Sequence, residues 1–336
     1  MAPGWAPRNG VKLSRKGMMM TDQVTADIPR TIAPESFFNI GNYESELAGI
    51  PAAEFNAAFP VLLNSRMGES VFTGPGSGGV LSSGIEAGGS TFGWLLGMDP
   101  SLWESLPVRR YRPAEPTGHR RDLLTSALAH LARAHPDLFA LVRSYVRMIC
   151  WLSVPPPEKL QIASASAPTL PFTIFTSDLG PRDLPPGTVT ESDCHRVLAE
   201  NLLHETTHQR ISFHLLEADV LAEDYDSATA AKVEIAWRKG KQQSEWEVDR
   251  VLHAAIVYNE VLRYRLREIQ DASCDPVSLA AFREAGDAAT GSVTFLADSL
   301  LGFERYFTGY GVEIVRGLRQ RTAKIVSAWQ ECRAGQ

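Results

Sequence analysis

The spacing of apolar residues predicts that most of this chain is helical. From Arg121 onward, apolar side chains recur at helical intervals, at Leu123, Leu124, Leu128 and Leu131. The pair His135-Pro136 interrupts this pattern, because proline is poorly tolerated inside a helix. A second apolar helix is predicted over residues 138–152, and a run of prolines follows it. We expect these two helices to serve as scaffold.

Two short segments after these helices have the composition of strands. Residues 159–165 and 172–176 are short and rich in β-branched or aromatic side chains, which predicts a small sheet. More helix follows, predicted over residues 190–216, where Thr190 and Asp193 resemble a capping box, over residues 245–269, and over most of the chain from residue 276 onward. The predicted fold class is therefore α+β, predominantly α-helical.

The chain before Arg121 differs in composition. Residues 1–20 predict a disordered tail, and residues 21–120 form an N-terminal region that contains a glycine-rich segment, 72–97. This segment matches GxGxxG formally, but it lacks the flanking strand and helix of a dinucleotide-binding turn, so we expect a flexible loop. Residues 121–336 are predicted to form a mainly helical, metal-binding catalytic domain, either separate from residues 21–120 or continuous with them.

Charge and cysteine content exclude several classes of protein. The 336 residues include 33 lysines and arginines and 39 acidic residues, a net charge of −6, which argues against nucleic-acid binding through overall positive charge. No apolar run reaches the roughly 18 residues that a membrane span requires. The four cysteines lie far apart in the sequence, which favours neither a disulfide scaffold nor a thiolate metal site. We therefore expect a cytoplasmic protein without a membrane or nucleic-acid partner.

One motif in the helix predicted over residues 190–216 indicates metal chemistry. His204, Glu205 and His208 form HExxH. Histidines four residues apart project from one face of a helix, so their imidazoles can bind the same ion, and the glutamate lies beside it. Apolar residues flank the motif on both sides, so the two histidines need either a metal or hydrogen-bonding partners. We do not expect the other upstream histidines, including His130 and His135, to bind metal.

A third ligand is expected from the helix predicted over residues 245–269, which carries His253 and Glu260. Seven residues separate them, about 10.5 Å along a helix axis, so only one of the two can join the site. Glu260 would complete a set of two histidines and one carboxylate, as in thermolysin-like zinc sites or non-haem iron sites. His253 would give three neutral imidazoles. The spacing in the sequence leaves both alternatives open.

Two longer segments resemble a known family. The stretches LAENLLHETTHQRISFHLLEAD and AWRKGKQQSEWEVDRVLHAAIVYNEV are similar to the HExxH proteins that are encoded beside ribosomal peptide precursors, the 2-oxoglutarate-dependent peptide β-hydroxylases. The resemblance covers roughly residues 121–267. It implies a zincin-like core with a small sheet and an HExxH helix, Fe(II) held by His204, His208 and His253, and 2-oxoglutarate as cosubstrate. The Leu-His-Ala of the family falls on 252–254, whereas Trp246 and Glu247 occupy the positions of its Arg-Pro.

The resemblance implies hydroxylation of a β-carbon in a ribosomally synthesised precursor peptide. The distal carboxylate of 2-oxoglutarate requires a guanidinium or ammonium group, and Arg238 and Arg250 are the candidates. An extended peptide is expected to pair with the strand at 172–176. The alternative is a zinc peptidase in which Glu205 is the general base and Glu260 the third ligand. A third interpretation is a non-catalytic peptide-binding protein.

Overall fold

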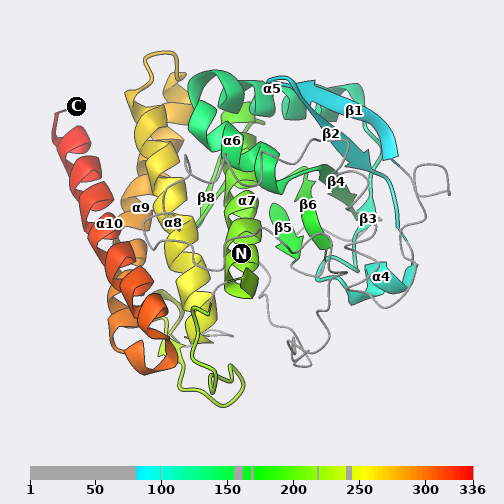
Figure 1. The fold of residues 1–336 in the computed structure, drawn as a ribbon. Coiled ribbons are helices and arrows are strands. Elements are labelled where there is room, and N and C mark those ends of the chain that lie inside the picture. Colours follow the sequence, from blue (N-terminus) through cyan, green and yellow to red (C-terminus); the bar gives the residue numbers. More distant parts are fainter. Residues whose placement is uncertain are drawn as a thin grey trace.

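The computed structural model describes residues 81–98, 100–154, 162–167, 170–217, 219–239 and 244–335. The expected tail at 1–20 and the first part of the glycine-rich segment lie outside these residues. The architecture is mixed α/β and mostly helical, with one small mixed sheet beside a group of long helices (Figure 1). Among the helices described, none has the length and apolar content to cross a membrane. The prediction of a predominantly helical α and β fold is confirmed at this level.

The main sheet has the strand order β1-β2-β4-β6-β5, and β3 pairs with the far end of β4. The strands are β1 Leu81–Ala87, β2 Ser90–Leu95, β3 Arg112–Pro113, β4 Met148–Ser153, β5 Ser164–Ala167 and β6 Leu170–Ser177. β4 runs parallel to both β2 and β6, while β5 is antiparallel to β6. Because β6 already pairs on both sides, the expectation that a peptide adds to residues 172–176 is wrong.

The end of the glycine-rich segment forms a hairpin instead of the expected loop. β1 and β2 pair antiparallel around Gly88 and Gly89, whose φ angles of +53° and +75° are those of a mirror-image two-residue turn. Phe92 and Trp94 alternate with more exposed residues and are buried on one face of β2. A side chain at Gly88 would also meet the ring of Phe139 at 2.5 Å. Glycine at this turn therefore builds the hairpin, and the prediction of a loop is wrong for residues 81–95.

The predicted helix over residues 138–152 is correct only in its first half. α5 Gly118–Ala134 and α6 Pro136–Tyr145 form the expected pair, but the chain becomes extended at Val146, with φ −128° and ψ 128°. β4 then occupies the middle of the sheet, and its residues 148–152 are all buried. A strand covered on both faces is apolar throughout, so its pattern cannot be told from that of a buried helix.

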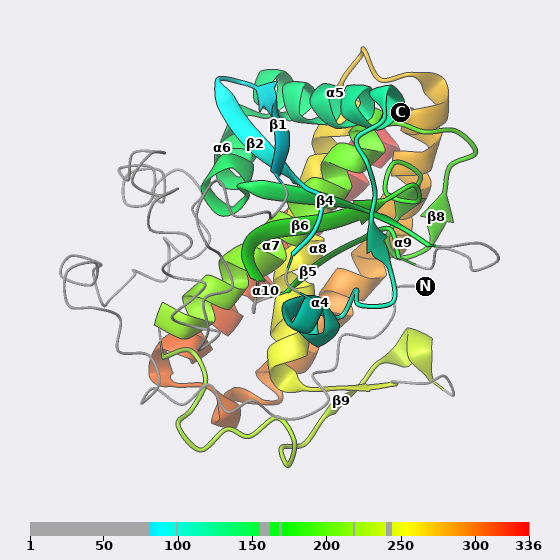
Figure 2. The ribbon, with the colours of Figure 1, turned by 90° about the vertical axis from the view of Figure 1, so that its right-hand side faces the viewer.

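The HExxH helix, α7 His195–Glu217, lies between the sheet and the remaining long helices (Figures 1 and 2). It packs on β5 and β6 on one side and on α8 on the other. The long helices are α8 Val248–Gln270, α9 Pro276–Leu301 and α10 Gly309–Ala334, and the short elements are α4 Pro100–Ser105, β7 Asp183–Leu184, β8 Thr188–Val189, β9 Val233–Glu234 and β10 Glu245–Trp246. The helical prediction from residue 276 onward is confirmed.

Two boundaries differ from those predicted by the sequence. α7 begins at His195, five residues after Thr190 of the expected capping box, and the Asp193 carboxylate of that box accepts hydrogen bonds from Arg182 and His119 instead. Residues 245–246 belong to the short strand β10 and precede α8. The hydrophobic core joins Phe92 and Trp94 to residues of α5 through α9. The described part of the N-terminal region thus shares one core with the helical part.

Candidate metal centre

α7 is fixed under the sheet on both sides of the HExxH motif. The Asn201 amide donates hydrogen bonds to the carbonyls of Gly180 and Asp183, at 2.8 and 2.7 Å. After the motif, the Gln209 amide donates to the Thr173 carbonyl of β6 at 3.2 Å. Thr206 and Thr207, inside the motif, are fully buried, and their hydroxyls donate hydrogen bonds to backbone carbonyls of the preceding helical turn. These contacts set which face of α7 carries the histidines.

The structure brings His204, His208 and His253 together between α7 and α8. The ring centres of His204 and His208 are 5.0 Å apart, and those of His208 and His253 are 5.8 Å apart. His253 reaches the motif because it lies in the second turn of α8, where that helix packs against α7. Three imidazoles from two helices therefore form one contiguous cluster, in which His208 is the central member.

The spacing of these rings is close to what a shared metal ion requires. Metal–nitrogen distances of about 2.1 Å place two coordinating rings roughly 4.5 to 5.5 Å apart, centre to centre. The His204–His208 pair lies within this range, and His208–His253 is slightly wider, with planes 19° apart. The three imidazoles of the motif cluster do not have all of their ligand atoms within 4.8 Å of one another. Among the described residues, the group that meets this distance lies elsewhere. Coordination at the motif therefore requires the ligand nitrogens of the three rings to come closer together than they lie in this structure.

The protein keeps all three imidazoles neutral. Burial lowers the pKa of His208 to about 3, helped by the nearby His253 and Arg250. Burial alone lowers the pKa of His253 to about 4. The pKa of His204 is also well below its ordinary value, because the ring is enclosed and lies beside His208. A metal ligand must be deprotonated, so these rings are ready to bind a cation at neutral pH.

Glu205 is attached to the sheet by two serines of the edge strand β5. Its carboxylate oxygens accept hydrogen bonds from Ser164 at 2.8 Å and from Ser166 at 2.7 Å. The same carboxylate lies 3.9 Å from Nε2 of His204. Burial raises the pKa of Glu205 to about 7, although both serine hydroxyls favour its charged form. Glu205 therefore connects β5 to the imidazole cluster, and sequence reasoning did not find the two serines.

Glu260 lies away from the histidines, in a cluster of arginines. Its carboxylate is 3.8 Å from Arg210, 3.3 Å from Arg263 and 3.4 Å from Arg321. Arg210 and Glu260 are almost completely buried, so each needs the other charge. The structure thus places Glu260 in an ion-pair network two turns of α8 beyond His253. This position favours His253 over Glu260 as the partner of the motif.

Arg238 and Arg250 lie on the same aromatic ring. The guanidinium carbon of Arg250 is 4.5 Å from the centre of the Trp246 ring, and that of Arg238 is 6.0 Å from it. Neither forms an ion pair within 4 Å with a carboxylate of the described residues, although the charge of Glu247 acts on Arg250. Burial lowers the pKa of Arg250, and the positive charge of Arg250 helps to lower the pKa of His208. Two guanidinium groups thus share one side of the site.

Comparison with models of known protein families and with curated proteins finds no match to this chain.

The neutral histidines predict that stability falls as the pH drops from about 6.5. Unfolded histidines bind protons near pH 6.5, while His208 and His253 of the folded protein bind them only near pH 3 and 4. The unfolded chain therefore binds more protons in this window, which lowers the free energy of unfolding. Glu205 opposes the trend, because its raised pKa makes the folded state take up a proton first.

The measurement is urea unfolding of metal-free protein at pH 7.5, 6.5, 5.5 and 4.5. We expect the urea midpoint of the unaltered chain to fall across this series. The H208Q/H253Q variant should show a smaller fall, because glutamine does not titrate. E205Q should show a larger one, because it removes the opposing proton uptake. An equal fall of the urea midpoint with pH in all three proteins would contradict the pKa shifts of His208, His253 and Glu205.

Proposed function

We propose that this protein is an Fe(II)- and 2-oxoglutarate-dependent oxygenase that hydroxylates a β-carbon in a ribosomally synthesised precursor peptide. The observation that carries the proposal is the juxtaposition of three neutral imidazoles with two guanidinium groups that have no ion-paired carboxylate among the described residues. A zinc peptidase needs a metal-binding set, but it does not need a dicarboxylate anchor. The resemblance of residues 121–267 to peptide β-hydroxylases supports the same conclusion.

In this proposal His204, His208 and His253 hold the iron. Neutral imidazoles leave the full charge of the cation uncompensated, which favours a dianionic cosubstrate as the remaining ligand. Bound iron and 2-oxoglutarate supply the oxidising chemistry: one oxygen atom of O₂ enters the C–H bond, the other enters succinate, and CO₂ is released. The protein contributes by enclosing the site, keeping the ligands deprotonated and orienting the cosubstrate and the peptide.

Arg250 is the stronger candidate for holding the distal carboxylate of 2-oxoglutarate. It is part-buried on α8, one turn before His253, and its guanidinium carbon lies over the Trp246 ring, 4.5 Å from the ring centre. Stacking on the indole restricts the side chain, so less entropy is lost when it binds a carboxylate. Arg238 approaches the same ring from the 3₁₀ helix Ala236–Arg238 and adds a second positive charge.

The arrangement around α7 also supports a zincin-like core as part of this proposal. The motif helix packs on the sheet next to β5, and β5 is antiparallel to its neighbour β6. Ser164 and Ser166 on β5 contact the glutamate of the motif directly. This edge of the sheet, rather than β6, is then the side from which a peptide approaches the histidines.

The proposal is tested with Fe(II), 2-oxoglutarate and oxygen, without knowledge of the peptide. Under anaerobic conditions, Fe(II) and 2-oxoglutarate together should give a weak visible charge-transfer band, and admission of oxygen should release succinate slowly. The H208Q variant should give neither. With a precursor peptide, the peptide mass should increase by about 16 Da, one oxygen atom. Absence of the band and of succinate from iron-loaded protein would refute the proposal.

The zinc peptidase remains the second candidate because of the position of Glu205. A buried carboxylate 3.9 Å from a candidate ligand nitrogen is placed as the general base of an HExxH peptidase would be. The E205Q variant separates the two functions. A peptidase should lose nearly all cleavage, because no base then activates the water, whereas the oxygenase should retain succinate release. Cleavage of a peptide by zinc-loaded protein, lost in E205Q, would favour the peptidase.

Replacement of Arg250 by methionine should weaken 2-oxoglutarate binding by about 10- to 100-fold, the value of one or two charge-assisted hydrogen bonds. Methionine keeps much of the side-chain volume and the contact with Trp246. We expect the KM for 2-oxoglutarate to rise while the Fe(II) content stays unchanged. Arg319, which pairs with Asp298 on the far helices, provides the matched control in R319M. An unchanged KM in R250M would exclude Arg250 as the anchor.

A further inference from the structure

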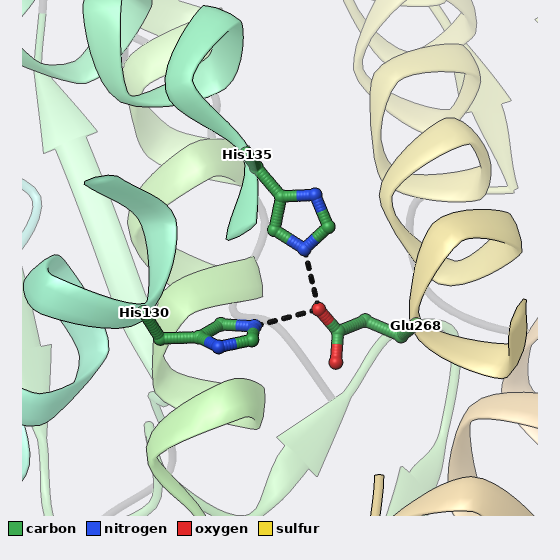
Figure 3. Close-up of side chains that lie close together, drawn as sticks. All are labelled: His130, His135 and Glu268. Carbon is green, nitrogen blue, oxygen red and sulfur yellow. Dashed lines mark hydrogen bonds and ion pairs between the residues drawn. The ribbon is translucent and has the colours of Figure 1, made fainter. Parts of the chain in front are cut away.

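A second cluster of metal-binding side chains lies at the opposite end of α8. Its members are His130 of α5, His135 between α5 and α6, and Glu268 near the end of α8 (Figure 3). Glu268 follows His253 by fifteen residues, which is about 22 Å along the helix axis. The two clusters therefore cannot share an ion, and the second has no part in the proposed oxygenase chemistry.

The side chains of this second cluster converge on one point. Nε2 of His130 and Nε2 of His135 lie 2.7 and 2.6 Å from the same oxygen, Oε1 of Glu268 (Figure 3). In both rings Nδ1 is buried without a hydrogen-bond partner in the described residues, so Nε2 makes the polar contact of each ring. The exposed fractions of the three side chains are 1%, 4% and 0%. Three ligand atoms from separate elements thus meet in a dry environment.

The surroundings hold the carboxylate in place. The other oxygen of Glu268 accepts a hydrogen bond from Arg196 at 2.6 Å, and Arg196 also pairs with Asp271 at 2.8 Å. Ligands in metal sites are commonly oriented by such outer partners. Apart from the two imidazoles, this network holds two carboxylates, those of Glu268 and Asp271, and one guanidinium, that of Arg196. The carboxylates outnumber the guanidinium by one, and this excess of negative charge favours a cation.

A pocket borders the two histidines of the cluster. It has a volume of about 480 Å³ and is lined by His130, His135 and Asp271, among others. Arg267 at its rim is already paired with Asp137, at 2.7 Å. Two histidines and one carboxylate leave coordination positions open, and a pocket of this size has room for the waters that fill them.

We propose that His130, His135 and Glu268 form a second metal site, which takes a divalent transition-metal ion of the zinc class. The cation binds the same three atoms. Each ring coordinates it through Nε2 as the neutral Nδ1–H tautomer, so the proton on Nε2 leaves to solvent and Nδ1 carries the N–H of the ring. Imidazole nitrogen and carboxylate oxygen are the ligand types that zinc accepts together. Because the ligands come from α5, the α5–α6 corner and α8, the ion connects these elements and stabilises the fold.

The test uses zinc alone, in the full chain with the H208Q substitution that disables the motif. After dialysis against limiting free zinc, we expect about one zinc per chain, and X-ray absorption should count two imidazole ligands. Adding E268Q should lower the zinc affinity at least tenfold. E268Q keeps an oxygen that can accept hydrogen bonds, so the fold should persist without the metal. Adding H119A instead should leave the zinc content unchanged, because His119 is exposed and pairs with Asp193.

Two results would overturn the second site. One is no stoichiometric zinc in H208Q, and the other is equal zinc affinity with and without E268Q. If E268Q does not fold, the ligand count in H208Q decides alone, because a count other than two imidazoles contradicts the assignment. The result is independent of the proposed oxygenase, which is tested by succinate release from the protein with its motif intact.

Discussion

Replacement of His253 by alanine should abolish retention of Fe(II) and reduce succinate release by more than about 100-fold, since loss of an outer partner of a metal ligand alone costs about 10- to 100-fold. His253 is the third imidazole of the cluster, with its ring 5.8 Å from that of His208. Two histidines of the motif alone leave a divalent ion weakly held. The measurements are the iron content after desalting and the initial rate of succinate formation.

Glu260 supplies the matched comparison on the same helix. E260Q should keep its iron and its succinate release, because Glu260 is engaged by Arg210, Arg263 and Arg321 rather than by the histidines. It should lower the free energy of unfolding, because Arg210 is then buried without its counter-charge. The opposite pattern, with metal lost in E260Q and kept in H253A, would restore the set of two histidines and one carboxylate.

The sequence predicted the two helices that carry the histidines, but it did not predict the contacts that these helices make with the rest of the fold. HExxH places two histidines on one face of a helix. On the second helix, His253 and Glu260 are seven residues apart and lie on the same face, so either could be the third ligand. The choice between them depends on how α7 and α8 pack. Arg210 lies two residues beyond the motif, and its pairing with Glu260 at 3.8 Å is a tertiary contact that no local pattern encodes.

The two main errors in the fold have different physical origins. β4 is apolar from Met148 to Leu152, where both of its faces are covered, and the preceding helix α6 is mostly apolar as well. Hydrophobic periodicity therefore did not separate them. The hairpin of β1 and β2 was missed for a different reason. Its two central glycines are typical of a two-residue turn, but the surrounding glycines and serines concealed the alternation around Phe92 and Trp94.

Contacts from distant strands were not predictable from the motif. Ser164 and Ser166 reach Glu205 only because β5 is the strand that packs on α7. The second cluster was also missed. His130 and His135 carry no motif spacing, and their common partner Glu268 lies more than a hundred residues away in the sequence. From the sequence alone, single histidines in or beside the helices α5 and α6 look like ordinary core residues, because only the fold shows that a carboxylate lies beside them.

Replacement of Arg265 by leucine should lower the free energy of unfolding by about 3 to 5 kcal/mol, the cost of leaving one charge of a buried pair without its partner. Arg265 of α8 and Glu200 of α7 are both completely buried, and the guanidinium Nε donates to the Glu200 carboxylate at 2.8 Å. Arg265 also donates to the carbonyl of Ala285 in α9 at 2.8 Å. One side chain therefore connects three helices next to the candidate metal centre.

Denaturant unfolding of three variants measures the contribution of this buried pair to stability. R265L/E200L removes both charges and should be more stable than R265L alone, because no buried charge remains unpaired. R316L removes an arginine of similar size whose pair with Glu304 is largely exposed, and it should cost less than about 1 kcal/mol. Because Glu200 lies one turn before His204, R265L should also weaken metal binding at the motif, whereas R316L should not. Equal losses of stability in R265L and R316L would show that the buried pair does not hold α7 against α8.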